Sequence, residues 1–184
     1  MILDGRRVDP GAQLVTDVCI VGAGPAGIAL ASELDGSGLD VCLLESGGLG
    51  FDRRTDSLND LGSSGADVGP PTATRRRQFG GTSNMWTVRL RSMSRGARYL
   101  PLRDVDFEQR DWIPHSGWPF NRSELDPFYR RAHTVCGLGP YEYESELWAD
   151  GDARPLALDS SQVVTAVEHF GPGDVFSRGL RGAL

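Results

Sequence analysis

The chain has 184 residues, a formal net charge of -6 and a pI near 5.0. This length suits one domain with a sizeable core and part of a second. The acidic balance argues against general nucleic-acid binding. There is no secretory signal and no apolar run long enough to cross a bilayer, so we expect a cytoplasmic protein without a membrane anchor.

The segment from residue 16 to residue 48 has the order of a dinucleotide-binding unit. Its apolar residues 17–21 predict a strand buried on both faces, and Gly22, Gly24 and Gly27 follow with the spacing G-x-G-x-x-G. Gly22 allows a sharp turn, Gly24 leaves room for a pyrophosphate, and Gly27 lets a helix pack closely on the strand. The glycines therefore predict an anionic dinucleotide as the ligand.

A helix is predicted directly after the glycines. Pro25 stands in its first turn, where no N–H is needed, so free amides and the positive helix end face the ligand. Gly36 and Gly38 end the helix, and residues 39–44 predict a second buried strand. The helical spacing is carried by Ile28, Leu30, Ala31 and Leu34.

Glu45 ends the second predicted strand, roughly twenty residues after the glycines. A carboxylate at this place accepts hydrogen bonds from an adenosine ribose and repels a 2′-phosphate, which favours FAD or NAD over NADP. The alternative is an ordinary tight turn and a solvated carboxylate. Because five elements agree in order, we favour the dinucleotide site.

Arginines dominate the middle of the chain. All nineteen basic residues are arginine, and residues 68–103 contain no acidic residue. The cluster is a solvated face, a nucleic-acid patch, or a set of charges around a bound diphosphate. The third interpretation is preferred to the second, because the aromatic pattern of nucleic-acid modules is missing. Its members are Arg75, Arg76, Arg77, Arg89, Arg91, Arg95, Arg98 and Arg103.

Residues 75–86, RRRQFGGTSNMW, form a second candidate loop, after a connection over residues 47–71 that we expect to carry at most a short helix. Gly80 and Gly81 permit close backbone approach, and the next three residues are small and polar. Such a loop can hold a phosphate or the edge of a flavin. A plain turn or a helix cap has the same composition, so the loop alone decides nothing.

An amphipathic helix is predicted within residues 116–137. We expect Ser123 as its N-cap, with Asp126 three residues later, and Gly137 at its end. His133 is predicted on the helix surface. The predicted apolar face consists of Leu125, Phe128, Ala132 and Val135, and the aromatic residues expected to pack around the helix are Trp112, Trp118, Phe120 and Tyr129.

The three cysteines have no metal-binding spacing and are odd in number, which argues against a zinc site or a disulfide framework. Cys19 and Cys42 are predicted to be small buried residues of the two strands. We assign no metal ligands.

The segments DVCIVGAGPAGIALA, VCLLESGG, RRRQFGGTSNMW and SGWPFNRSELDPFYRRA together resemble the N-terminal half of glucose-methanol-choline (GMC) oxidoreductases over roughly residues 17–139. The resemblance implies FAD rather than NAD. Members of this family oxidise alcohols by hydride transfer to the flavin, with a histidine that accepts the proton. Some carry a histidine that attaches the flavin covalently, and Met85 stands at the matching position here, so we expect dissociable FAD.

The predicted fold is α/β, a Rossmann-like FAD/NAD(P)-binding fold with an incomplete parallel sheet, followed by the start of a substrate domain. We expect the cofactor-binding part in residues 1–100 and a partial cap or substrate segment in residues 101–184. The predicted cofactor-binding residues are Gly22, Gly24, Pro25, Ala26, Gly27, Glu45, Ser46, Gly80, Gly81, Thr82, Ser83 and Trp86.

No catalytic residue is predicted within this chain. The resemblance places the catalytic histidine in a later portion of the family pattern, and His115, His133 and His169 do not match it. We therefore expect the N-terminal part of an oxidoreductase for alcohol or sugar-type substrates, with a C-terminal chain as a possible complementing partner. The alternatives are a non-catalytic FAD- or nucleotide-binding remnant and an NAD-dependent dehydrogenase domain.

Overall fold

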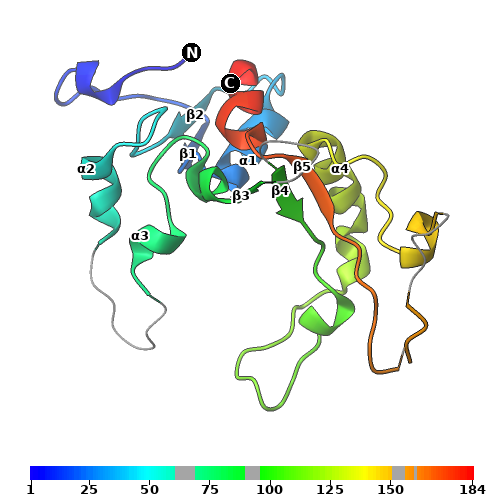
Figure 1. Cartoon of the computed structure of the whole chain (residues 1–184). Coiled ribbons are helices and arrows are strands. Elements are labelled where there is room, and N and C mark those ends of the chain that lie inside the picture. The colour runs from blue at the N-terminus through cyan, green and yellow to red at the C-terminus, as the bar shows by residue number, and fades with distance from the viewer. Residues whose placement is uncertain (61–68, 90–95, 151–155, 160) are drawn as a thin grey trace. The chain divides into compact units, whose positions relative to one another are not determined.

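The computed structural model describes residues 1–60, 69–89, 96–150, 156–159 and 161–184, and it divides into two compact units (Figure 1). The first unit combines residues 1–87 with residues 173–184, and the second contains residues 88–172. These units differ from the predicted division at residue 100, because the end of the chain returns to the first unit. The predicted division is one of function, cofactor against substrate, and it stays a prediction.

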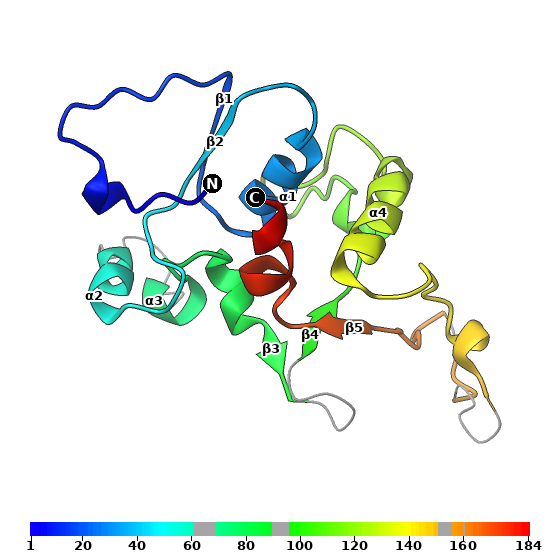
Figure 2. The same cartoon turned by 90° about the horizontal axis from the view of Figure 1, so that it is seen from above.

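The first unit contains a parallel β-α-β arrangement. Strand β1 (Val18–Val21) pairs in parallel with β2 (Val41–Leu44), in a register that joins Val18 to Val41 and Val21 to Leu44. Helix α1 (Pro25–Leu34) connects them, as Figure 2 shows. Pro25 opens the helix, and both Gly36 and Gly38 have positive φ after its end. The predicted strand, helix, strand order is confirmed.

The predicted burial of these strands is wrong. Val21 is 82% exposed, Cys19 is exposed and Cys42 is half-buried. The reason is that this sheet has two strands, so few neighbours cover its residues in the part of the chain that the structure describes. The buried apolar residues of β1, the turn and α1 are Ile20, Ala23, Ile28 and Ala31.

Short helical segments make up most of the remaining first unit. Helix α2 (Arg53–Asp56) continues into the 3-10 helix Ser57–Asn59, and α3 (Pro71–Thr74) precedes the 3-10 helix Gly81–Met85. Helix α2 and the 3-10 helix Ser57–Asn59 agree with the short helix expected in the 47–71 connection. Residues 61–68 of this connection lie outside the described residues. A further 3-10 helix, Gly5–Arg7, lies near the N-terminus.

The C-terminal residues close the first unit. A π-helical turn, Val175–Gly179, contacts the 3-10 helix Gly81–Met85, and the following 3-10 helix Leu180–Ala183 contacts α1. Val175 and Phe176 are buried there. The end of the chain is therefore held to the first unit by two short helical turns.

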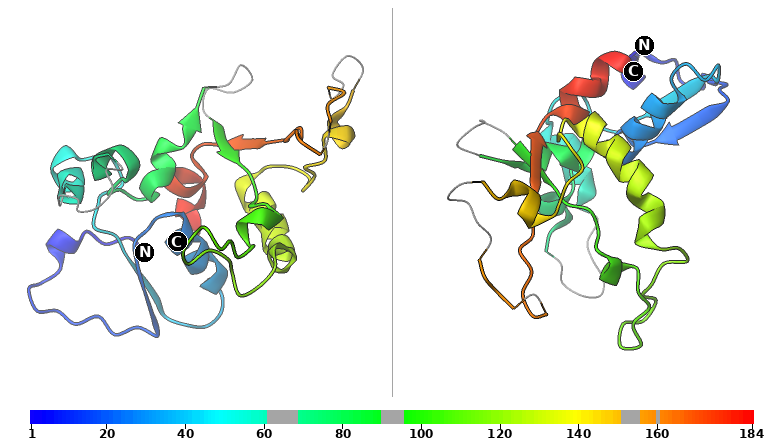
Figure 3. Two further views of the ribbon diagram at one scale, coloured as in Figure 1. Left: turned by 90° about the horizontal axis from the view of Figure 1, so that it is seen from below. Right: turned by 90° about the vertical axis from the view of Figure 1, so that its right-hand side faces the viewer.

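The second unit is built on antiparallel pairing between β4 (Gly96–Tyr99) and β5 (His169–Pro172). The short strand β3 (Thr87–Val88), where the chain enters this unit, completes the order β3-β4-β5. Both views of Figure 3 show β4 and β5 side by side. Helix α4 is accompanied by three 3-10 helices. The bounds of these four helices are Asp126–Cys136, Asp104–Asp106, Arg122–Leu125 and Ser145–Trp148.

The start of α4 differs from the prediction. Asn121, not Ser123, caps the preceding 3-10 helix, and the Glu124 carboxylate accepts the Asn121 backbone N–H at 3.1 Å. The two residues thus form a capping box at the start of the 3-10 helix. The end is as predicted, because Gly137 has φ 62° and its N–H caps the last turn.

The buried face of α4 is also not the predicted one. Phe128 is 59% exposed and Val135 40% exposed, whereas His133 and Cys136 are each 4% exposed. Gly171 of β5 lies directly against the Cys136 carbonyl, where any Cβ would collide, so the face that carries Cys136 meets the strand. The contact with β5 thus decides which side of the helix is covered.

The aromatic residues near α4 pack only in part as expected. Trp118 and Phe120 pack on each other and on Phe107, with ring centroids 5.5–5.9 Å apart. Tyr129 stacks on Tyr141. Trp112 is 77% exposed, so its predicted packing role is wrong.

Candidate functional site

The glycines of the turn between β1 and α1 have two different roles, helix packing and access to open space. A Cβ at Gly27 would collide with the Gly22 carbonyl oxygen, so Gly27 serves the packing of the helix on the turn. A Cβ at Gly24 would meet no atom within 4 Å. Gly22 has φ 101°, which favours glycine on backbone grounds alone. Open space lies beside the backbone at both Gly22 and Gly24, and at Gly24 the backbone would also accept an alanine.

Glu45 ties the glycine turn to the end of β2. Its carboxylate accepts the Ala23 N–H at 2.9 Å through one oxygen and the Gly47 N–H at 2.7 Å through the other. The Ser46 hydroxyl also donates to this carboxylate, at 3.4 Å. The sequence predicted either a ribose partner or a solvated carboxylate, and neither includes these protein contacts. A carboxylate has roughly four acceptor positions, so the three bonds leave capacity for a ligand.

The loop with sequence GGTS reaches the same turn from another part of the chain. The Gly80 N–H donates to the Ala23 carbonyl at 2.8 Å, and a Cβ on Gly81 would lie 2.9 Å from Gly24 Cα. Two motifs more than fifty residues apart in sequence thus lie in direct backbone contact. The positive φ of Gly80, 88°, supports the sharp bend this requires.

Side chains inside the loop stabilise its shape. The buried Ser83 hydroxyl donates to the Gly80 carbonyl at 2.6 Å, and the Asn84 amide donates to the Phe79 and Gly81 carbonyls at 3.0 and 2.8 Å. Ser83 and Asn84 therefore face the loop backbone. Thr82 and Trp86 instead line the space next to the loop.

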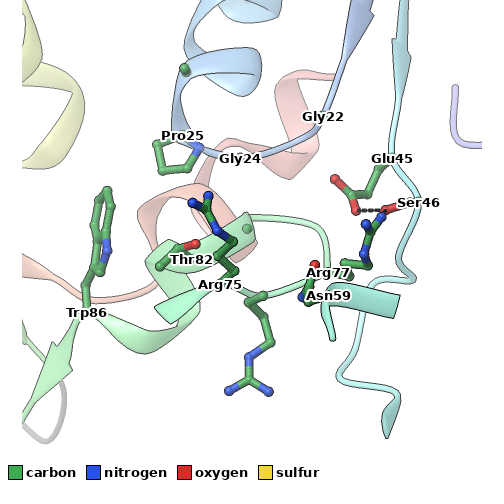
Figure 4. A pocket seen from close by; sticks show the side chains of 13 residues that line it. Gly22, Gly24, Pro25, Glu45, Ser46, Asn59, Arg75, Arg77, Thr82 and Trp86 are labelled. Atoms are coloured by element: carbon green, nitrogen blue, oxygen red, sulfur yellow. Dashed lines mark hydrogen bonds between the residues drawn. The ribbon is translucent and has the colours of Figure 1, made fainter. Parts of the chain in front are cut away.

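A hollow of about 540 Å³ lies between the turn and the loop, within the first unit. Figure 4 shows the glycine turn on one side of this space and Thr82 and Arg75 on the other, with Arg77 beside Ser46 and Glu45. Predicted residues that do not line it are Gly27, Gly80 and Ser83. Those that do are Gly22, Gly24, Pro25, Ala26, Glu45, Ser46, Gly81, Thr82 and Trp86. We name this space the glycine-turn hollow.

Sequence reasoning missed four further residues of the wall. They are Asn59 and three consecutive arginines, Arg75, Arg76 and Arg77. The sequence hinted at the arginines, because one interpretation of the arginine cluster was a set of charges around a bound diphosphate. No sequence feature pointed to Asn59. Of the other cluster members, Arg98 pairs with Glu168 at 3.2 Å in the second unit, and Arg91 and Arg95 lie outside the described residues.

The second unit contains a histidine and tyrosine cluster that is closed on itself. His133 Nε2 lies 2.7 Å from the Tyr143 hydroxyl and Nδ1 lies 3.3 Å from the Gly139 carbonyl, so the predicted surface position of His133 is wrong. His169, 6% exposed, lies with its ring nitrogens 3.1 and 2.8 Å from the Leu138 and Glu142 carbonyls.

The electrostatics of this cluster follow from burial. Burial lowers the pKa of the His133 imidazole, with a smaller contribution from His169, because the charged form loses water. Burial also raises the pKa of Tyr143 to about 12. Both groups are held neutral near pH 7, which allows the phenol O–H to donate to Nε2 and Nδ1–H to donate to Gly139. The ring nitrogens are occupied by structural bonds.

Comparison with known proteins identifies the cofactor. A family model described as "FAD binding domain" matches residues 15–48, which hold the glycine turn and Glu45. The chain is also 29% identical, over 148 residues, to 6'''-hydroxyparomomycin C oxidase of Streptomyces lividus. The match covers 71% of this chain and 25% of that protein, so the chain spans about a quarter of its relative. No solved structure matches.

These matches support FAD as the cofactor and an FAD-dependent oxidoreductase as the class of protein. The wall of the glycine-turn hollow fits such a group, since it offers open space at Gly24, spare carboxylate acceptors and guanidinium donors. Among the described helices, none has both the length and the apolar character needed to cross a bilayer.

Proposed function

We propose that the chain is the FAD-binding part of a GMC-type oxidoreductase that oxidises CH–OH groups of alcohol or sugar-type substrates by hydride transfer to the flavin. The four sequence segments that resemble this family support the proposal. The printed name of the relative, an oxidase of a hydroxy compound, agrees with it. When bound, FAD supplies the redox chemistry, and the protein supplies placement.

One observation carries the proposal. The glycine turn and the GGTS loop, found separately in the sequence, share one hollow and are joined by the Gly80 to Ala23 hydrogen bond. A lone glycine motif is weak support for a dinucleotide site. Two motifs at the wall of one cavity that also contains Glu45 are much more specific.

The proposed roles follow the order of the cofactor's groups. Open space at Gly24 and the free amide of Ala26, at the start of α1, suit the pyrophosphate. Glu45 accepts the adenosine ribose hydroxyls, with Ser46 beside it. The resemblance assigns the loop, with Thr82 and Trp86 at the hollow, to the flavin end. Met85 at the position of the attaching histidine favours dissociable FAD.

We assign no catalytic residue in this chain. The ring nitrogens of His133 and His169 face hydrogen-bond partners within the second unit. The substrate, the rest of the active site and turnover therefore depend on residues beyond those described, which we propose come from a further C-terminal portion or a complementing chain. The competing proposal is a module that binds FAD and never turns over.

The direct test is FAD titration, followed by quenching of flavin fluorescence, on a matched pair of glycine variants. Gly24→Ala places a methyl group in the hollow without touching protein, because nothing lies within 4 Å of that Cβ. Gly50→Ala is the control, since its Cβ also meets nothing and Gly50 is not part of the wall. We expect FAD to bind the wild type and Gly50→Ala, and to be lost or weakened at least about tenfold in Gly24→Ala.

Two outcomes separate the alternatives. If NAD but not FAD binds the wild type, the dehydrogenase interpretation replaces this one. If FAD binds, mixing the chain with candidate C-terminal halves and an alcohol tests turnover by dye reduction. Restored reduction supports the enzyme, whereas FAD binding with no turnover in any combination selects the binding module.

A further inference from the structure

Three consecutive arginines line the glycine-turn hollow, and their partners distinguish them. Arg76 pairs with the buried Asp56 at 3.3 Å and its guanidinium lies 4.5 Å from the centre of the Phe51 ring. Its charge and its aromatic contact are therefore both used within the protein. Arg76 is a structural residue of the wall.

Arg75 and Arg77 are different. The Arg75 side chain is exposed and makes no hydrogen bond or ion pair with any residue that the structure describes. Arg77 also lines the hollow and donates from Nη1 to the Ser46 hydroxyl at 3.0 Å, and its guanidinium makes no further hydrogen bond with a described residue. Guanidinium donors without protein partners at the wall of a cavity are groups that a bound anion would satisfy.

Asp56 fixes this segment against α2. One carboxylate oxygen accepts the Arg77 backbone N–H at 3.0 Å and the other accepts from the Arg76 guanidinium. Asp56 thus holds the Arg76 side chain and the Arg77 backbone, while the Arg75 side chain and the Arg77 guanidinium are not bonded to it.

The side chains that line the glycine-turn hollow carry an excess of positive charge. With Arg76 neutralised by Asp56, two guanidinium groups remain against the single carboxylate of Glu45, which is already bonded to backbone amides. The hollow is therefore electropositive. A doubly anionic diphosphate is the part of FAD that matches this excess, and planar guanidinium groups bind its oxygens in pairs.

We propose that Arg75 and Arg77 bind the diphosphate of the cofactor and that Asp56 is the positioning residue that presents them. This inference rests on the proposed FAD site and adds side-chain charge to the backbone amides of the glycine turn. It assigns function to the segment before the GGTS loop and to α2, neither of which belongs to the predicted dinucleotide unit.

The test compares ligands with and without phosphate on the full chain. ADP, inorganic pyrophosphate and adenosine compete with FAD for the wild type and for Arg75→Gln, Arg77→Gln and Asp56→Asn. Arg53→Gln on α2 is the matched control, because Arg53 is exposed and is not part of the wall. Arg75→Lys and Arg77→Lys keep the charge and guard against loss of folding.

We expect each glutamine variant to weaken ADP and pyrophosphate about tenfold, the effect of one charge-assisted contact, and to leave adenosine within about twofold. Asp56→Asn should weaken ADP severalfold and spare adenosine, and the lysine variants should retain most of the ADP affinity. Arg53→Gln should change nothing.

Two results would overturn the proposal while leaving the FAD site intact. One is unchanged ADP affinity in both arginine variants, with FAD still bound. The other is an equal loss of ADP and adenosine, which would mean that the arginines shape the hollow rather than contact phosphate. Failure of the wild type to bind FAD would reject the proposed function itself.

Discussion

The glycine-turn hollow and the cluster around His133 and His169 use their polar side chains in opposite ways. At the hollow, the Arg75 side chain has no partner among the described residues, and the Arg77 guanidinium bonds only the Ser46 hydroxyl. In the second unit, every ring nitrogen of His133 and His169 faces an acceptor or a hydroxyl. Polar groups that satisfy one another hold a fold together, whereas polar groups left over around a cavity are available to a ligand. The following experiments test this contrast.

The largest expected effect is at Gly27. Gly27→Val places a side chain against the Gly22 carbonyl, so we expect the first unit to lose about 3 kcal/mol or more of unfolding free energy, the upper end of overpacking costs. Denaturant titration followed by Trp86 fluorescence, in a background where the three second-unit tryptophans are phenylalanine, measures this. Gly24→Ala should lose FAD while its midpoint stays unchanged. Equal destabilisation by both variants would erase the distinction between a packing glycine and a ligand glycine.

Next is the closed histidine cluster. His133→Leu leaves the half-buried Tyr143 hydroxyl and the Gly139 carbonyl without their partners, which should cost the second unit about 2 kcal/mol. Fluorescence of the second-unit tryptophans during urea unfolding reports the change. FAD affinity should be the same as in the wild type. Weakened FAD binding in a folded His133→Leu protein would show that this cluster serves the cofactor.

A smaller effect is expected from acid. The folded pKa of His133 lies below its ordinary value of 6.5, so the unfolded chain binds the proton first as pH falls. Stability of the second unit is therefore full above pH 6.5 and declines as the pH drops toward the folded pKa. His133→Gln should flatten this decline, while the control His115→Gln, at an exposed position, should not. Because His169 and Tyr143 remain in both variants, the difference between the two pH profiles belongs to His133.

The smallest effects concern the cysteines. Cys19 is exposed and Cys136 is 4% exposed, with its thiol pKa raised by burial. Ellman's reagent should therefore modify Cys19 readily in the native protein and reach Cys136 only on unfolding. Cys19→Ser should change stability by less than about 0.5 kcal/mol, as is usual for surface positions. Slow labelling of Cys19 in the monomeric chain would mean that this thiol is buried, as the sequence predicted.

Local patterns predicted the β-α-β unit well. Pro25, Gly36 and Gly38 bracket α1 as expected, and Gly137 ends α4, because proline and positive-φ glycine act through the backbone of their own neighbours. The composition of the wall was mostly predictable for the same reason, since the glycine spacing and the acid after β2 are short-range features. Nine of the twelve predicted cofactor residues line the hollow.

Burial was predicted poorly. The face of α4 that carries Phe128 and Val135 is more apolar, yet the face with His133 and Cys136 is covered because β5 approaches it through Gly171. Cys19 was expected inside because its strand is apolar, but burial depends on how many strands and helices surround it. A single sequence does not state which distant segment will cover a given side chain.

The amino-acid sequence alone predicted a dinucleotide site at the turn between β1 and α1, because that signal resides in the backbone freedom of nearby glycines and in one carboxylate. Tertiary structure alone decided that the GGTS loop joins this turn, that Asp56 holds the arginine segment, and that His133 and His169 are buried against carbonyls and a tyrosine hydroxyl. Those relations join residues that are remote in the chain, and only packing brings their hydrogen-bonding groups within reach.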